Sequence, residues 1–373
     1  MDSARRGAAV ALLLVAGLHG CVTADPDAGS DVTLPGPGVG DQPGRAARAV
    51  EVARACEECH ADIASEQRLS RHASAFTNSA FQTALQKDNL PFCRSCHAPE
   101  APQNTAPPAD LGGLGVGCAT CHLAGDTILA APSDRPLRAP HRVARSARFA
   151  EESACAGCHQ FAFLGDKLPG VPDLMQLTIE EHEISAYSNV SCAGCHMPLV
   201  GEGPRRHRSH RFSGSRTPEE QARALRITAS RASPTEIEIE IAPGEVGHAY
   251  PTGDLFRRLE VRVEAVTSEG AVVAREVRYL ARHFERRLSP SGHPVRALLW
   301  DDRPGAPGPA AEGVTLRMDL GAASADRLFD LRVSLQRVAQ LVEGRPERES
   351  PVESESLLFS SVLPPETPSR EGP

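Results

Sequence analysis

The sequence predicts two folded parts: a mainly α or irregular domain of short helices and loops, followed by an antiparallel β-sandwich-like domain. Five Cys-x-x-Cys-His motifs lie between 56 and 196, in sequence with little regular hydrophobic periodicity. From 235 onward, polar and apolar residues alternate in several short runs, which is the pattern of half-buried strands. We therefore place the two domains at 45–215 and 216–363.

The repeated motif predicts five covalently attached c-type haems. In each copy two thiols can add to the vinyl groups of one haem, and the adjacent histidine can reach the iron. A zinc ribbon does not need a histidine after every second cysteine, and neither does a disulfide framework. The cysteines are Cys56, Cys59, Cys93, Cys96, Cys118, Cys121, Cys155, Cys158, Cys192 and Cys195. The motif histidines are His60, His97, His122, His159 and His196.

Residues 1–21 have the pattern of an export signal. Two arginines precede an apolar run at 8–18 that is too short to span a bilayer. The run ends in Leu-His-Gly-Cys, which resembles the lipobox of bacterial lipoproteins, so we expect a lipid anchor at Cys21. His19 departs from the small or aliphatic residue usual there, and an ordinary secretory signal stays open. Either route predicts a periplasmic or cell-envelope protein, and no later segment is apolar enough to span a membrane.

Two segments have the composition of flexible chain. Residues 22–44 are rich in proline, glycine and aspartate, which cannot bury a core, so a tether is expected. Residues 364–373 are rich in proline and glutamate and are expected to be disordered.

Within the first domain, short helices are expected at 46–55, 74–87 and 177–187. This domain has few aliphatic side chains, and we expect the porphyrins themselves to form its core. In the second domain a helix is expected to start at Thr217, which has a proline and two glutamates after it. Strands are expected at 235–242, 259–266, 271–280, 313–320, 328–338 and 354–363. Short strands with turn signals between them are typical of a β-sandwich.

Eight further histidines could supply the second axial ligand of an iron, and this ligand separates an electron carrier from an enzyme. A second histidine closes the iron to substrate, whereas an open position can bind a small molecule. These histidines are His72, His141, His182, His207, His210, His248, His283 and His293.

The stretch from CEECH through SRHASAF, FCRSCH, GVGCATCHLAG, PHRV and CAGCH resembles multihaem c-type cytochromes, in particular the tetrahaem partner of hydroxylamine oxidoreductase and its wider relatives. The resemblance implies His72, His141 and His210 as distal ligands, the last within a His-x-Phe-x-Gly segment. His248 lies in GHAYPTG at 247–253, which resembles a segment in the β-domains of such cytochromes. It is either a ligand presented by this loop or a residue that caps a tight turn.

The other histidines and the departures from the family complete the expectation. His207 competes with His210, His182 is expected at the surface of a helix, and His283 and His293 are expected in loops of the β-domain. The named tetrahaem protein lacks the fifth haem and the β-domain found here. Pentahaem nitrite reductases have one motif that ends in lysine, whereas all five motifs here end in histidine, which argues against nitrite reduction.

The sequence as a whole predicts an exported pentahaem cytochrome c that relays electrons between periplasmic or membrane redox proteins, as in a respiratory chain, without catalytic residues of its own. The number of histidines favours this interpretation, since there are enough of them to give every iron a second axial ligand. One alternative is a multihaem oxidoreductase with one open-site haem acting on a small nitrogen or sulfur compound. Another is a β-domain that docks a partner complex. The formal net charge of −8 argues against nucleic-acid binding.

Overall fold

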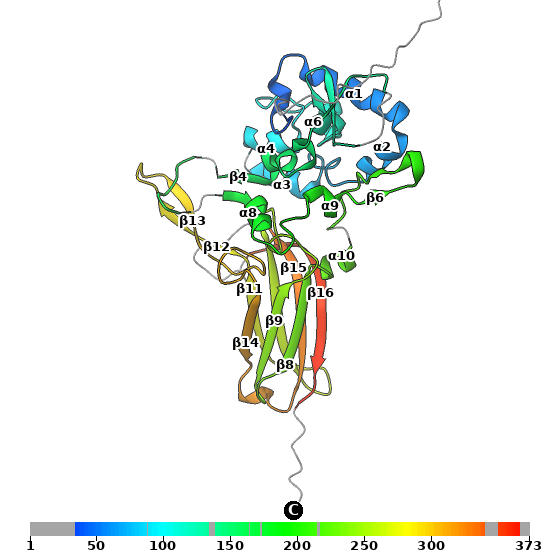
Figure 1. Cartoon of the computed structure of the whole chain (residues 1–373). Helices are drawn as coiled ribbons and strands as arrows, with labels where there is room; N and C mark the ends of the chain where they lie inside the picture. The colour runs from blue at the N-terminus through cyan, green and yellow to red at the C-terminus, as the bar shows by residue number, and fades with distance from the viewer. Residues whose placement is uncertain are drawn as a thin grey trace, which may run out of the picture.

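The computed structural model describes residues 34–87, 89–133, 139–163, 165–171, 174–214, 217–339 and 350–365. In Figure 1 the short helices gather at one end of the molecule and the long strands at the other. The export signal, Cys21 and most of the C-terminal tail lie outside these ranges. Within the part of the chain that the structure describes, no helix has both the length and the apolar character needed to cross a membrane.

The N-terminal region consists of short helices joined by loops and very small sheets. Its α-helices are α1 (Arg45–Cys59), α2 (Ala61–Arg68), α3 (Ser79–Lys87), α4 (Pro91–His97), α5 (Ala109–Leu114), α6 (Cys118–His122), α7 (Ser153–His159), α8 (Thr178–Glu183) and α9 (Cys192–His196). Its 3-10 helices are η1 (Val39–Asp41), η2 (Arg148–Ala150) and η3 (Gly203–Arg205). Its strands are β1 (Leu123–Ala124), β2 (Thr127–Ala130), β3 (Val143–Arg145), β4 (Gln160–Ala162), β5 (Leu174–Leu177), β6 (Leu199–Val200) and β7 (His207–Arg208).

The expected helices of this region are present with different bounds. The helix at 46–55 is α1, which continues to Cys59 and so carries the first motif. The helix expected at 74–87 begins only at Ser79, and the helix expected at 177–187 ends at Glu183. An N-cap explains the first of these changes, since Asn78 accepts a hydrogen bond from the Phe81 amide at 3.2 Å.

The expectation of a flexible tether is wrong for residues 34–44. The Gly38 and Gly40 amides donate to the carbonyls of Ser95 and Pro99, at 2.8 and 2.7 Å. The Asp41 carboxylate accepts a hydrogen bond from the Gln103 amide at 2.9 Å. A Cβ on Gly40 would lie 2.4 Å from a backbone oxygen of the 100–101 segment. Proline and glycine here therefore allow close packing against the domain rather than flexibility.

The C-terminal region is a β-sandwich, as predicted. Its strands are β8 (Leu225–Arg231), β9 (Glu236–Pro243), β10 (Arg257–Val266), β11 (Val272–Leu280), β12 (Arg282–Leu288), β13 (Pro294–Asp301), β14 (Val314–Asp319), β15 (Leu328–Val338) and β16 (Val352–Leu363). One antiparallel sheet has the order β11-β10-β15-β16 and the other β14-β9-β8. All six predicted strands are confirmed. The short helix α10 (Pro218–Ala222) begins with a capping box at Thr217 and Glu220, also as expected.

The core of the sandwich explains why these strands were visible in the sequence. The alternating isoleucines of β9 and the alternating apolar residues of β10 are almost fully buried and point into one cluster with those of β14 and β15. Strands β8, β12 and β13 were not predicted, and the last two form a separate hairpin that projects from the sandwich (Figure 1). Charged residues on both faces of β12 hide the period of two in its sequence.

Candidate haem centres

Each Cys-x-x-Cys-His motif lies on or at the end of a short helix. The first motif closes α1, and helices α4, α6, α7 and α9 each end at their motif histidine. Residues three apart lie on one face of a helix, so the two cysteines of a motif face the same side. All ten of these cysteines are free thiols in the structure. The local fold therefore presents the two thiols and the adjacent imidazole together, as attachment of one haem requires.

The orientation of three motif imidazoles is set by backbone carbonyls. The Nδ1 atoms of His97 and His122 lie 2.8 Å from the carbonyl oxygens of Ala75 and Leu129. His196 Nδ1 lies 2.7 Å from the Ser213 carbonyl. Because a carbonyl oxygen only accepts, Nδ1 carries the proton and donates. Nε2 is then left with a free lone pair, which is the form of histidine that binds a metal.

Three motif histidines each face a second imidazole. The ring centroids are 6.2 Å apart for His159 and His72, 6.1 Å for His122 and His210, and 6.3 Å for His196 and His248. The planes of these pairs are inclined by 63°, 27° and 4°, respectively. Two imidazoles on opposite sides of one iron need a centroid separation of roughly 6 Å, since each metal–nitrogen bond is about 2 Å. The residues therefore fit three iron sites with two histidine ligands each.

Burial favours the neutral form of most of these imidazoles by lowering their pKa. Desolvation lowers the pKa of both His72 and His159 to about 4. It also lowers the pKa of His122, His210 and His248. A neutral imidazole has the lone pair that a metal takes, so these buried side chains are ready to act as ligands.

The His-x-Phe-x-Gly segment at 210–214 serves more than one centre. His210 faces His122, while the Phe212 ring contacts the His72 ring edge-on at 4.3 Å. The carbonyl of Ser213 orients His196. A Cβ on Gly214 would lie 3.1 Å from the His196 ring, so only glycine leaves that ring in place without adjustment.

Thiols of different motifs lie against one another. A thiol of another motif raises the pKa of each of three cysteines: Cys118 acts on Cys56, Cys192 on Cys155, and Cys96 on Cys158. The third motif is also near the fourth, because Cys121 acts electrostatically on both Cys155 and Cys158. In the haem-loaded protein these sulfurs would form the thioethers that attach the porphyrins. The contacts therefore connect all five motifs into one group, with the fourth motif next to three others.

His60 and His97 have no second imidazole in this arrangement among the described residues. His60 is exposed at the start of α2. The Phe81 ring stacks on the His97 ring at a centroid distance of 3.8 Å and an angle of 10°. His141 is exposed, with its Nδ1 3.4 Å from the Arg142 carbonyl. The structure pairs His141 with no motif histidine, and its role as a distal ligand stays a prediction.

The remaining histidines have other surroundings. His207 Nε2 lies 3.3 Å from the Glu66 carboxylate, so His210 rather than His207 is the one that faces a motif histidine. The expectation that His182 is a surface residue is wrong: it is 8% exposed and packs under the 247–252 loop. The expectation that His283 lies in a loop is wrong: it is on strand β12, and its ring stacks on Trp300 at a centroid distance of 4.5 Å. His293 lies in the loop between β12 and β13, as expected, 2.8 Å from the Asp166 carboxylate.

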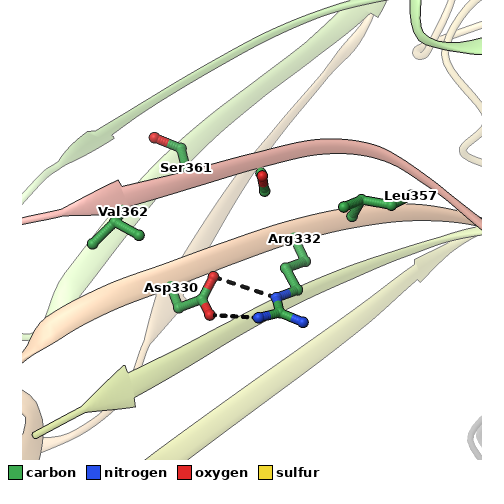
Figure 2. A pocket seen from close by; sticks show the side chains of 6 residues that line it. Asp330, Arg332, Leu357, Ser361 and Val362 are labelled. Atoms are coloured by element: carbon green, nitrogen blue, oxygen red, sulfur yellow. Dashed lines mark hydrogen bonds and ion pairs between the residues drawn. The ribbon is translucent and has the colours of Figure 1, made fainter. Parts of the chain in front are cut away.

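A shallow hollow on the sandwich is remote from these centres. Figure 2 shows its lining on β15 and β16, with Asp330 and Arg332 joined in an ion pair of 3.0 Å. Its remaining lining residues are Leu357, Ser360, Ser361 and Val362. It has no histidine, cysteine or aromatic side chain, so it has none of the residues that haem attachment needs.

Comparisons with known proteins agree with this geometry. The family model described as "Cytochrome c554 and c-prime" matches residues 55–123, which include the first three motifs. The fold is similar to the crystal structure of a penta-heme cytochrome c552 from Thermochromatium tepidum, with a TM-score of 0.59 and 18% identity over 84% of this chain and 98% of that one. A β-glucuronidase of glycoside hydrolase family 2 is also found, at a TM-score of 0.16 with 13% identity, over 38% of this chain and 11% of that one, and it carries no argument.

No curated protein sequence matches the chain. At this level of identity the likeness to the penta-heme cytochrome concerns the fold, and the family model concerns the region of the first three motifs. Together with the helices that present the motifs, these findings support a multihaem c-type cytochrome with covalently bound haem c.

Proposed function

We propose that this chain is an exported pentahaem cytochrome c that relays electrons between redox proteins. The facing imidazole pairs carry the proposal. Three of the five motif histidines have a second imidazole at the separation that one iron requires. An iron with two histidine ligands has no position for a substrate, so such a centre accepts and donates electrons.

The proposed ligands follow from the geometry. Each motif attaches one haem by its two cysteines, and its histidine is the proximal ligand. His72, His210 and His248 are proposed as distal ligands opposite His159, His122 and His196. Haem supplies the reversible one-electron reduction of its iron. The protein's own contribution is to orient four of the six paired imidazoles by a carbonyl and to keep water away from the buried pairs.

The contacts between motifs support a relay rather than five separate centres. Thiols of different motifs shift one another's pKa, and together with the effect of Cys121 these interactions link all five motifs. A donor and an acceptor can therefore dock at different haems and still exchange electrons. We propose that these partners are redox proteins outside the cytoplasm, by analogy with the tetrahaem partner of hydroxylamine oxidoreductase that the sequence resembles. A lipid anchor at Cys21 would hold the relay at a membrane of the cell envelope.

The test is the haem content and spin state of the purified oxidised protein. The pyridine haemochrome should give five haems per chain. EPR and optical spectra should show at least three low-spin haems that do not react with nitrite, hydroxylamine or carbon monoxide. Fewer than three low-spin haems in a fully loaded protein would contradict the proposed ligand pairs.

A second candidate is an oxidoreductase with one open haem, and the surroundings of His97 favour it. This histidine is held by the Ala75 carbonyl and by Phe81, and none of the described imidazoles faces it. An iron there would have an open position for a small nitrogen or sulfur compound. A high-spin fraction near one haem in five that disappears on adding hydroxylamine or nitrite would support this candidate. A fully low-spin protein would exclude it.

A further inference from the structure

The loop that presents His248 belongs to the β-domain but works on the other domain. It connects β9, which ends at Pro243, to β10, which begins at Arg257. Its His248 lies opposite His196 on α9, with the two ring planes only 4° from parallel. The loop itself is neither helix nor strand, so its position has to be determined by contacts from outside it.

Helix α8 of the N-terminal region supplies one set of these contacts. The Nδ1 atom of His182 donates to the Gly247 carbonyl at 2.8 Å. The hydroxyl groups of Thr178 and Thr252 lie 2.9 Å apart, and the Thr252 hydroxyl also donates to the Glu181 carboxylate. The loop is therefore held at both ends of the 247–252 segment, one residue from His248 on one side.

Arg303 of the β-domain supplies the second set. Its guanidinium donates to the Pro251 carbonyl at 2.7 Å and to the Glu181 carboxylate at 2.7 Å. It also donates to Asp301, the last residue of β13, at 2.6 Å. The Glu181 and Arg303 side chains are only 0% and 3% exposed. Arg303 thus joins the loop, the sandwich and α8 at one buried point.

Buried charges impose this arrangement. A buried carboxylate or guanidinium is tolerated only where opposite charge and hydrogen bonds compensate for its lost hydration. Glu181 lies on α8 and Arg303 in the β-domain, so their ion pair exists only while the loop is docked on α8. Undocking would leave the Glu181 carboxylate without its guanidinium partner, and would leave Arg303 with Asp301 and the Pro251 carbonyl of its own domain. Docking is therefore favoured in one geometry, the one that brings His248 opposite His196.

We propose that Glu181 and Arg303 are positioning residues that hold the 247–252 loop, so that the β-domain supplies the distal ligand of the fifth haem. This inference rests on the His196–His248 ligand pair of the proposed function. It gives the β-domain a defined role in the relay, since closing this iron depends on a residue that the sandwich carries.

The experiment uses the haem-loaded full chain and three variants: Arg303→Met, Glu181→Gln and Thr252→Val. Each should convert up to one haem in five from low-spin to high-spin in the EPR spectrum. The lost low-spin signal should be the one of a pair with nearly parallel imidazole planes, because the mutual angle of the two planes sets the anisotropy of a low-spin ferric haem. Added imidazole should restore the low-spin state, since it can occupy the position that His248 has left.

Matched controls separate positioning from general disruption. Glu180→Gln changes the neighbouring residue of α8, an exposed glutamate that hydrogen-bonds Gln160 at 2.9 Å. Arg231→Met removes an arginine whose guanidinium lies over the Phe329 ring, 3.5 Å from its centroid, and donates a hydrogen bond to the Pro234 carbonyl. Both controls should keep the wild-type spectrum. Arg303→Lys, which retains the charge but not the planar fork of donors, should give a smaller high-spin fraction than Arg303→Met.

His248→Ala distinguishes failure of this inference from failure of the proposed function. If His248→Ala leaves every haem low-spin, the His196–His248 ligand pair itself is wrong. If His248→Ala yields one high-spin haem while the three loop variants stay low-spin with five haems per chain, the positioning role is wrong. If Arg303→Met does not accumulate as a loaded protein, Thr252→Val decides, because it removes only one hydroxyl.

Discussion

The two regions of this molecule differ in how much hydrophobic core their side chains form. The sandwich buries a continuous cluster of isoleucine, leucine, valine, methionine and phenylalanine from both of its sheets. The region of the motifs has only small clusters, such as Ala49, Ala119 and Leu123, or Ala98, Ala101 and Leu111. It also buries charged side chains, with Arg45 and Glu100 joined at 2.7 Å. One region therefore has an extensive side-chain core, and the other has only small clusters among its described residues, which agrees with the proposal that porphyrins fill the space between its helices.

This difference indicates how strongly the stability of each region should depend on haem. Apolar burial contributes roughly 25 cal/mol per Å², and the sandwich obtains it from its own residues. Clusters of a few alanines and leucines supply little of it. We therefore expect the two regions to respond differently to loss of haem, to loss of core volume and to loss of a buried ion pair.

The largest expected effect follows from producing the chain in cells that cannot attach c-type haem. Because the side-chain clusters of the N-terminal region are small, this region should lose its protection from protease completely when no haem is attached. The sandwich should survive as a fragment close to 217–363. Limited proteolysis with mass spectrometry measures this, and the haem-loaded chain is the control. Equal resistance of both regions without haem would show that the side chains of the N-terminal region suffice for its fold.

Loss of core volume should affect the sandwich next most strongly. Phe329 is fully buried on β15, and Phe329→Ala should reduce the free energy of unfolding by about 3–5 kcal/mol. Denaturant unfolding followed by far-UV circular dichroism measures the change. Leu328→Ala is the control, since this neighbour is 37% exposed, and it should cost less than about 0.5 kcal/mol. Similar losses for both variants would contradict a core that lies between the two sheets.

A smaller effect is expected for the buried ion pair of the other region. Arg45 on α1 donates to Glu100 and also to the carbonyls of Ala119 and Leu123, at 2.7 and 2.6 Å. Lysine cannot reproduce this fork of donors, so Arg45→Lys should cost about 1.5–3 kcal/mol. Thermal unfolding of the loaded protein, followed at the haem absorption band, measures the loss.

The matched control for this change is Arg48→Lys on the same helix. Arg48 pairs with Asp126 at the surface, and exposed ion pairs contribute only about 0–1 kcal/mol. A loss as large for Arg48→Lys as for Arg45→Lys would mean that the buried pair has no special part in joining α1 to the third motif.

Much of the fold could be predicted because its signals are local. The strands β10 and β15 alternate polar and apolar residues along their length, and such a period requires no knowledge of the partner strand. The hairpin β12–β13 could not be predicted, since both of its strands carry arginines and lie outside the main core. The packing of 34–44 was missed for another reason: its glycines allow close contact with residues more than fifty positions away.

The sequence by itself determined where haem can be attached, because the two thiols and the histidine of a site lie within five consecutive residues. It also identified the segments around His72, His210 and His248, through their resemblance to multihaem cytochromes. Only the tertiary structure decided which motif each of them faces, and that His210 rather than His207 faces His122. It alone revealed Glu181 and Arg303 at the junction of the domains. A second ligand and a buried ion pair both join residues distant in sequence, and packing alone brings these together.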